Sequence, residues 1–250
     1  MSFLRSTFIH LRIIVYFFLT IIVLVISFFP EGWLLYFLVT ESDLDMIHYL
    51  MAPMYLFIAY CLTVLFFGVV HSQIVVRFLL TFRIKPGIYS HHSAMGRLVG
   101  VRITADSIFK AMLKVFTFFP FIWGILLFPY GMRLYGLKCG KNVHITTRTY
   151  VDTAGLVEIG NNAFIGYNCV VTGHTHENRA IIVNPTKIGR KALVGAYSIV
   201  GPGCELGDSA VLGAMSGLPK GEKIPEGEVW VGTPAKFLRR RGEKQDQQEV

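Results

Sequence analysis

Hydrophobic residues follow two different patterns along this chain. Between residues 13 and 70 they form long, almost unbroken apolar runs, whereas beyond residue 139 single aliphatic residues recur every six positions. Helices repeat apolar positions at intervals of about 3.6 residues and strands at about 2, so a period of six fits neither. A short fixed period instead indicates one small unit stacked on copies of itself. The clearest members are Ile188-Gly189, Val194-Gly195, Val200-Gly201, Leu206-Gly207 and Leu212-Gly213.

The six-residue repeat predicts a parallel β-helix. Short strands joined by sharp corners point each aliphatic residue inward, and the following glycine tolerates the backbone angles of a corner. The same phase starts earlier, at Ile159-Gly160 and Ile165-Gly166. We therefore expect an all-β, left-handed parallel β-helix over residues 136–241. About three hexads close one coil of such a fold, so residues 139–217 would form roughly four coils.

The repeat is interrupted once, after Val171. The inserted sequence is Thr172-Gly173-His174-Thr175-His176-Glu177-Asn178-Arg179, and in-phase hexads return only at Ile188. An insertion in a repeat usually forms an external loop, often on the functional face. After Gly217 we expect the chain to leave the repeat through Pro219, Lys220 and Pro225. Residues 242–250 are polar and are predicted to be a disordered tail.

The apolar runs of the first half predict a membrane domain over residues 1–135. Residues 13–29 and 47–70 are each long and apolar enough for a transmembrane helix. Arginines precede the first run and basic residues follow the second, while the intervening segment carries acidic residues and no Lys or Arg. By the positive-inside rule both termini and the β-helix then lie on the cytoplasmic side, which makes this a multi-pass integral membrane protein.

Shorter apolar segments follow the two spans. Residues 106–119 are predicted to form an amphipathic helix, with Lys110 and Lys114 turned toward lipid phosphates. Residues 116–130 are interrupted by prolines and are expected to be interfacial or re-entrant; whether they span the membrane stays open. The histidines outside the repeat are expected to be interfacial polar residues. They are His10, His48, His71, His91 and His92.

Composition narrows the partners of the chain. The 250 residues are 53% hydrophobic, with a formal net charge of +8 contributed largely by residues that flank the apolar runs and by the C-terminal tail. No basic stripe is interleaved with aromatic residues, so we expect membrane lipids and not nucleic acid as partners. The four cysteines have neither disulfide nor metal-site spacing and are expected to be small core hydrophobes.

His174 is the first candidate for catalysis, because it stands where the regular repeat stops. Imidazole has a pKa near 6.5 and is suited to removing a proton from a hydroxyl or amine near neutral pH. No nucleophile elbow accompanies it, so direct attack by the deprotonated acceptor is simpler than a covalent enzyme intermediate. Such an attack requires a donor with a good leaving group, and a thioester meets that requirement.

These features resemble a known family. Residues 137–241 resemble the hexapeptide-repeat acyltransferases that include galactoside and maltose acetyltransferases, through Thr172-Gly173-His174 and the closing segment Val231-Gly232-Thr233-Pro234-Ala235-Lys236. Taken as a whole, the chain is similar to the membrane-bound C-terminal module of poly-lysine-type peptide synthetases. Lys85-Pro86-Gly87 and Leu156-Val157-Glu158-Ile159-Gly160 carry that second resemblance.

The resemblance implies a donor and an assembly. The donor would be acyl-coenzyme A, with acetyl-coenzyme A expected, and no metal would be needed. By position, Ala196 and Ala214 match residues that line the pantetheine groove, while Lys220, Lys236 and Arg239 match positions near the coenzyme A tail. The family is trimeric, with each site between neighbouring β-helices, so the resemblance implies a homotrimer.

The match is incomplete at the acceptor side. Thr146 and Ala154 stand where the galactoside enzyme holds its sugar, and neither is suited to that role. Asp152, in the preceding coil, is either a carboxylate partner of His174 or a corner residue in place of glycine. His176 is the second candidate for the base.

Acyl transfer to a hydroxyl or amine of a membrane-associated acceptor is therefore the leading hypothesis. A lipid-linked saccharide, a surface-polymer intermediate or a lipid head group would each fit; the acyl chain length stays open. One alternative is a metal-dependent hydratase similar to γ-type carbonic anhydrases, using His144, His174 and His176, although that family spaces its loop pair as His-x4-His. The other alternative is a non-catalytic trimeric membrane scaffold.

Overall fold

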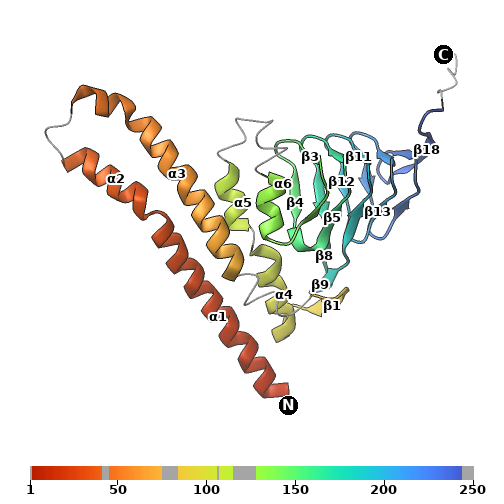
Figure 1. The fold of residues 1–250 in the computed structure, drawn as a ribbon. Helices are drawn as coiled ribbons and strands as arrows, with labels where there is room; N and C mark the ends of the chain where they lie inside the picture. The colour runs from red at the N-terminus through yellow and green to blue at the C-terminus, as the bar shows by residue number, and fades with distance from the viewer. Residues whose placement is uncertain (1, 41–44, 75–83, 106, 115–127, 244–250) are drawn as a thin grey trace.

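The structure, a computed structural model, describes residues 2–40, 45–74, 84–105, 107–114 and 128–243 (Figure 1). Apolar helices come first and a parallel β-solenoid follows, as the two sequence patterns predict. The helices lean against one end of the solenoid, and the C-terminal strand lies at the other end (Figure 1). Residues 244–250, most of the predicted disordered tail, fall outside the described residues.

Three helices form the most apolar part of the molecule. They are α1 (Ser2–Ser27), α2 (Phe29–Thr40) and α3 (Met46–Ile74). The stretches Ser6–Thr40 and Met46–Ile74 are each long and apolar enough to cross a membrane. Many of their large apolar side chains are exposed, for example Phe29 at 69% and Leu50 at 76%. Exposed apolar surface of this extent is typical of a surface that faces another apolar medium.

The first apolar stretch is longer than predicted. The predicted helix covers residues 13–29, whereas in the structure α2 begins at Phe29 and contains Pro30 in its first turn. Proline is tolerated there because the first turn of a helix has amide groups without intrahelical partners. The helical path therefore resumes directly after Ser27 and continues to Thr40.

Short elements connect the long helices to the solenoid. They are β1 (Gly87–Ser90), α4 (Ala94–Thr104), α5 (Ser107–Leu113) and α6 (Phe128–Leu134). α5 is the described part of the predicted amphipathic helix, and the predicted segment 116–130 lies almost entirely outside the described residues. The predicted orientation of Lys110 is wrong. Its side chain is buried, with Nζ 3.4 Å from the carbonyl oxygen of Val151 and 4.5 Å from the ring centre of Tyr150.

The solenoid has three walls of parallel strands. The first wall contains β2 (Lys138–Cys139), β5 (Val157–Ile159), β10 (Thr186–Ile188), β13 (Glu205–Leu206) and β16 (Lys223–Ile224). The second contains β3 (His144–Ile145), β6 (Phe164–Ile165), β11 (Leu193–Val194), β14 (Val211–Leu212), β17 (Glu228–Val231) and the antiparallel β18 (Lys236–Arg240). The third contains β4 (Tyr150–Asp152), β7 (Val170–Thr172), β12 (Ile199–Val200) and β15 (Gly217–Leu218).

The aliphatic residue of each hexad stacks on its equivalents in the coils above and below. Ile188 pairs with Ile159 on one side and with Leu206 on the other, and all three are buried. The glycines that follow allow neighbouring coils to approach closely. A Cβ on Gly166, for example, would lie 2.6 Å from the backbone nitrogen of Ala196 in the next coil. The period of six is therefore the spacing of a continuous internal column.

The repeat does not end at Gly217, which corrects the sequence prediction. Leu218 pairs with Val200, Ile224 with Leu206 and Trp230 with Leu212, so the six-residue phase continues to β17. Prolines follow Leu218 and Ile224 where glycine stands in earlier hexads. Because the inward aliphatic residue sets the phase, these corners tolerate proline, and the first wall contains five strands instead of the expected four.

The interruption after Val171 is a strand hairpin and not an irregular loop. β8 (His174–Glu177) and β9 (Ala180–Val183) pair antiparallel, and β1 pairs antiparallel with β9 to give the order β1-β9-β8. Val99 and Ile103 of α4 pack with Ile181 and Val183 of the hairpin in a small separate core. The segment that follows the long helices is thus joined directly to the insertion of the solenoid.

Candidate functional site

The interrupted corner of the solenoid depends on a glycine. The chain leaves the third wall at Thr172 and enters the hairpin at His174, with Gly173 between them. A Cβ on Gly173 would overlap the side chain of Leu156 and lie 2.9 Å from its carbonyl oxygen. Only glycine fits this approach without displacing the backbone of residue 156. The position of His174 is therefore fixed by close packing of two chain segments.

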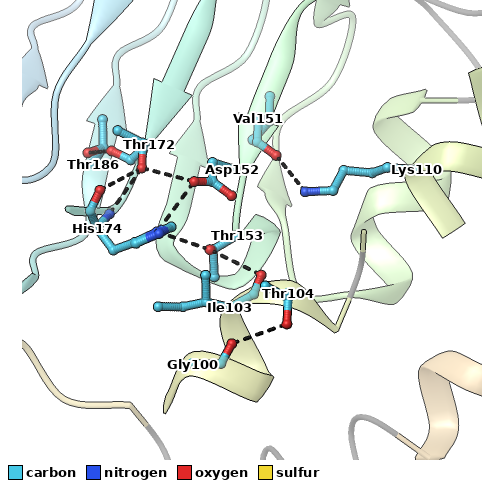
Figure 2. A network of polar contacts seen from close by, with 10 residues as sticks. All are labelled: Gly100, Ile103, Thr104, Lys110, Val151, Asp152, Thr153, Thr172, His174 and Thr186. Carbon is cyan, nitrogen blue, oxygen red and sulfur yellow. Dashed lines mark hydrogen bonds and ion pairs between the residues drawn. The ribbon is translucent and has the colours of Figure 1, made fainter. Parts of the chain in front are cut away.

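His174 is buried among polar groups, with only 7% of its side chain exposed. Its Nδ1 atom lies 3.5 Å from Oδ2 of Asp152 and 3.3 Å from Oγ1 of Thr153 (Figure 2). The hydroxyl of Thr172 accepts a hydrogen bond of 3.2 Å from the His174 amide and lies 2.8 Å from the His174 carbonyl oxygen. The same hydroxyl lies 3.4 Å from Oδ2 of Asp152. The structure thus brings His174 and Asp152 together. This is the geometry required if Asp152 is the carboxylate partner of His174.

Thr153 is a site residue that the sequence analysis missed. It is buried and has a φ angle of 56°, in the left-handed region that β-branched residues rarely adopt. Its hydroxyl also lies 3.4 Å from the carbonyl oxygen of Ile103, so it stands between α4 and His174 (Figure 2). Other corners of the solenoid, such as those at Lys191 and Tyr197, also hold a residue in this region, so the φ angle identifies Thr153 as a corner residue. The sequence indicated only that residue 153 lies in a corner, because Val151 and Asp152 occupy the aliphatic and glycine positions of a hexad.

His176 faces a different environment from His174. Its side chain is exposed, and its Nδ1 lies 3.0 Å from Nε2 of His91, which comes just after β1. The rings of His174 and His176 meet edge to face, with their centres 5.3 Å apart. His91 therefore contacts the hairpin, and its expected interfacial position stays a prediction. Both candidate bases lie on one short strand, and only His174 has a carboxylate within 4 Å of a ring nitrogen in the described part of the chain.

His71 departs from the prediction of an interfacial residue. It is fully buried in α3, with Nδ1 2.7 Å from the hydroxyl of Tyr135 and Nε2 3.2 Å from the hydroxyl of Tyr16. Its ring stacks on Phe67 at a distance of 4.8 Å between ring centres. The residue therefore connects α1, α3 and the entrance to the solenoid, and its contacts are those of a structural histidine.

Ala196 and Ala214 occupy equivalent corners in two successive coils. The amide of Met215, next to Ala214, donates a 2.8 Å hydrogen bond to the carbonyl oxygen of Ala196. These corners join the second wall to the third, and Ala214 is exposed. Two small residues are thus stacked at the same edge of the solenoid.

The three basic candidates lie elsewhere on the chain. Lys220 follows β15 on the opposite side of the third wall, and its Nζ lies 2.6 Å and 2.7 Å from the two carboxylate oxygens of Glu177. Lys236 and Arg239 belong to β18, at the far end of the second wall. Five residues were matched to a coenzyme A site. Within a single chain, only Ala196 and Ala214 of these five lie close together.

The described residues contain no cluster of three His, Cys, Asp or Glu side chains arranged to hold a metal ion. His144 lies in the second wall and stacks on Phe164, with ring centres 5.1 Å apart, whereas His174 and His176 lie beyond the third wall. The cysteines of the solenoid are free thiols in the core. Burial raises the pKa of Cys169, and it raises the pKa of Cys204 to about 11, so neither is a reactive thiolate.

Two family models match the solenoid. The family described as bacterial transferase hexapeptide (six repeats) matches residues 185–220, and the hexapeptide repeat of succinyl-transferase matches residues 156–182. The solenoid is a hexapeptide-repeat domain. The second match includes most of the hairpin, so the insertion that holds His174 lies inside the matched region. The predicted repeat and its parallel β-helix fold are thus confirmed.

Known proteins resemble parts of this chain. The delta-poly-L-ornithine synthetase of Acinetobacter baumannii is 29% identical over 123 residues, which are 47% of this chain and 9% of that protein. The galactoside O-acetyltransferase of Escherichia coli is 31% identical over 119 residues, 45% of this chain and 56% of that protein. The chain thus spans less than two thirds of either relative. A solved structure of galactoside acetyltransferase in complex with coenzyme A has 20% identity and a TM-score of 0.37, covering 44% of this chain and 68% of that one.

Proposed function

We propose that this protein transfers an acyl group from acyl-coenzyme A to a hydroxyl or amine of a membrane-associated acceptor. The observation that carries this proposal is the contact between the buried imidazole of His174 and Asp152 at the corner of the hexapeptide repeat from which the hairpin leaves. Relatives of the repeat include an enzyme named galactoside O-acetyltransferase. The apolar helices joined to the same corner favour an acceptor that resides in or on a membrane.

The contacts of His174 favour a role as general base. With the proton of Nδ1 directed toward Asp152, the basic lone pair of the ring is on Nε2. His174 then takes the proton of the acceptor as the acceptor attacks, and Asp152 stabilises the resulting imidazolium. Acyl-coenzyme A supplies the activated acyl group and a thiolate leaving group. The proton held by His174 passes to the departing sulfur, which restores the neutral ring.

The donor site is proposed to be shared between protomers. Ala196 and Ala214 would contact the pantetheine arm of coenzyme A, because small side chains at these corners leave room for it. Lys220, Lys236 and Arg239 would bind the phosphates. Since one chain places these residues at three separate positions, a single donor site requires residues of two copies, which supports the proposed homotrimer.

The proposed topology has two spans, with both termini and the solenoid in the cytoplasm, where coenzyme A is found. Its support is the charge pattern of the sequence and the exposed apolar side chains of α1 to α3. Single cysteines at Asp45 and Lys141, in a chain whose Cys61 and Cys139 are replaced by serine, test it. Impermeant maleimide should label the two from opposite faces of sealed vesicles; labelling of both from one face would contradict the topology.

The activity is tested with the full chain in lipid nanodiscs. Radioactive acetyl-coenzyme A is supplied with a bacterial lipid and polymer extract, and both thiol release and label in the extract are measured. We expect thiol release that depends on the extract, with equal label in the acceptor. Removal of the label by mild base would identify an ester, and its retention an amide. Absence of both thiol release and coenzyme A binding would instead favour the non-catalytic scaffold.

A further inference from the structure

A groove of about 510 Å³ lies where α1, α4 and the hairpin meet. Its volume is within the range of small-molecule sites, roughly 300–1,000 Å³. Ile13 and Ile14 of α1 form one side, Val101 and Ile103 of α4 form the other, and His176 of the hairpin contributes to the lining. Aliphatic walls of this kind bind apolar groups and offer little to a soluble sugar.

The groove opens onto the apolar surface of α1. Ile14 lines the groove and is nevertheless 51% exposed, and the neighbouring side chains Phe17 and Phe18 on the same helix are also more than half exposed. These side chains belong to the stretch that is apolar enough to cross a membrane. The aliphatic wall of the groove is thus continuous with the surface proposed to face lipid.

A positive charge lies at the groove. Arg97 lines it, and its side chain is exposed. Its Nε donates to Nε2 of His10 at 3.1 Å and its Nη1 donates to the carbonyl oxygen of His92 at 2.8 Å. Within the described residues Arg97 has no carboxylate partner, so its charge is not neutralised there. A guanidinium in this situation is suited to a phosphate group.

Two residues that line the groove, Ile103 and His176, connect it to the surroundings of the candidate base, although His174 itself is not part of the lining. Ile103 contributes its side chain to the groove, and its carbonyl oxygen lies 3.4 Å from the hydroxyl of Thr153 (Figure 2). That hydroxyl lies 3.3 Å from Nδ1 of His174, and the ring of His176 in the groove lies edge to face with the ring of His174. The aliphatic wall, Arg97 and His176 thus line one groove, and His174 contacts the ring of His176 directly and Ile103 through Thr153.

We propose that this groove is the acceptor site and that its occupant is a lipid carrying a phosphate next to the group that becomes acylated. The apolar chain would lie against Ile13, Ile14 and Val101, the phosphate would bind Arg97, and the hydroxyl or amine would point to His174. The last part rests on the proposed function, whereas binding of the lipid does not. Entry is from the bilayer, because the groove opens beside the exposed residues of α1.

Photo-crosslinking tests the groove without any need for turnover. The full chain is placed in phosphatidylcholine nanodiscs with a trace of phosphatidic acid that carries a diazirine in its acyl chain, and crosslinked peptides are mapped by mass spectrometry. We expect labelling of α4 residues 94–104 to fall at least fivefold in Arg97→Gln and to be retained in Arg97→Lys. Ile14→Trp, which fills the groove, should reduce it similarly. Matched controls are Lys141→Gln, another exposed basic residue, and Leu11→Trp on α1 outside the groove lining.

A diazirine diacylglycerol, which lacks the phosphate, should label the outer face of α1 but label α4 at least fivefold less than the phosphatidic acid does. Equal labelling of α4 by the two probes, or full labelling in Arg97→Gln, would overturn the proposal. Thiol release from acetyl-coenzyme A is measured on the same variants in parallel nanodiscs supplied with the lipid and polymer extract. Thiol release without labelling of α4 refutes the groove and leaves the acyltransferase standing; labelling of α4 without thiol release supports the lipid site and refutes the acyltransferase.

Discussion

Two corners of the same solenoid use their polar side chains in different ways. At the regular corner between the second and third walls, the hydroxyl of Ser198 donates a 2.7 Å hydrogen bond to the carbonyl oxygen of Gly213 and accepts one from the amide of Ser216. At the interrupted corner, Asp152, Thr153 and His174 contact one another. At the regular corner, side chains form hydrogen bonds with the backbone of the next coil. At the interrupted corner, the three side chains contact one another and can take part in chemistry.

The two corners differ because, at the interrupted corner, residues of the segment after the hairpin form the hydrogen bonds with the backbone. Thr186, where the chain re-enters the first wall, donates to the carbonyl oxygen of Thr172 at 2.7 Å and accepts from the amide of Gly203 at 3.1 Å. Asn184 accepts from the Gly203 amide at 2.7 Å and donates its own amide to the carbonyl oxygen of Gly173. Backbone groups of Thr172, Gly173 and Gly203 at this corner thus find their partners in the segment that re-enters the solenoid. A break in a repeat can therefore create a site without weakening the repeat.

His174→Ala is expected to have the largest effect on kcat of all substitutions at the two corners. If His174 takes the proton of the acceptor, kcat should fall by roughly 10²–10⁴, while the affinity for coenzyme A is unchanged. In the wild type, kcat/KM should rise with pH as the ring of His174 loses its proton, because only the neutral ring accepts a proton. Steady-state kinetics with the lipid extract, together with coenzyme A calorimetry, measure both quantities.

The control at the regular corner is Ser198→Ala, which should lower thermal stability and leave kcat within about threefold of wild type. His176→Ala should reduce activity less than His174→Ala does. An active His174→Ala enzyme beside an inactive His176→Ala enzyme would assign the base to His176. Retention of activity by both would exclude histidine catalysis at this corner.

Asp152→Asn comes next in expected size. A hydrogen bond to a charged group contributes about 1.5–3 kcal/mol, so loss of the carboxylate should reduce kcat by roughly 10- to 150-fold. Because the carboxylate stabilises the protonated ring, the pH at which kcat/KM rises should also move downward. A smaller kcat with an unmoved pH profile would mean that Asp152 is only a corner residue.

Gly173→Ala addresses the packing that holds the site. The added methyl group overlaps Leu156, and we expect a loss of about 1–3 kcal/mol in the free energy of unfolding. Gly100→Ala in α4 is the matched control, since its Cβ would lie 3.6 Å from Ile181, an ordinary contact. Chemical denaturation of both variants in detergent measures the difference. Equal stability of the two would show that the corner is not closely packed.

The smallest expected effect concerns Glu177 and Lys220. Because the carboxylate of Glu177 contacts Lys220, it competes with any phosphate at that position. Glu177→Gln should therefore lower KM for acyl-coenzyme A by a few-fold, and Lys220→Ala should raise KM with little change in kcat. A change confined to kcat in Lys220→Ala would place the donor elsewhere.

The comparison also explains how much of the molecule could be predicted from sequence. The regular coils were predictable because one inward residue per hexad sets the register. Two parts of the repeat were predicted incorrectly: its end, where Pro219 and Pro225 replace glycine, and the corner at Ala154–Leu156, where a 3-10 turn interrupts the repeat before Val171. His174 and Asp152 could be selected by their position at the interruption. Thr153 and His91 could not, because their roles depend on contacts with segments about 50 and 85 residues away in the chain.

The pairing of β1 with β9 has a practical consequence for work on the isolated solenoid. A protein that starts at residue 136 would lack β1 and would leave one side of β9 without its hydrogen-bonding partner. It would also uncover Ile181 and Val183, which α4 otherwise packs against. An apolar strand edge of this kind recruits strands from other molecules. Such a truncation should therefore aggregate through the hairpin, and a useful expression boundary lies before Gly87.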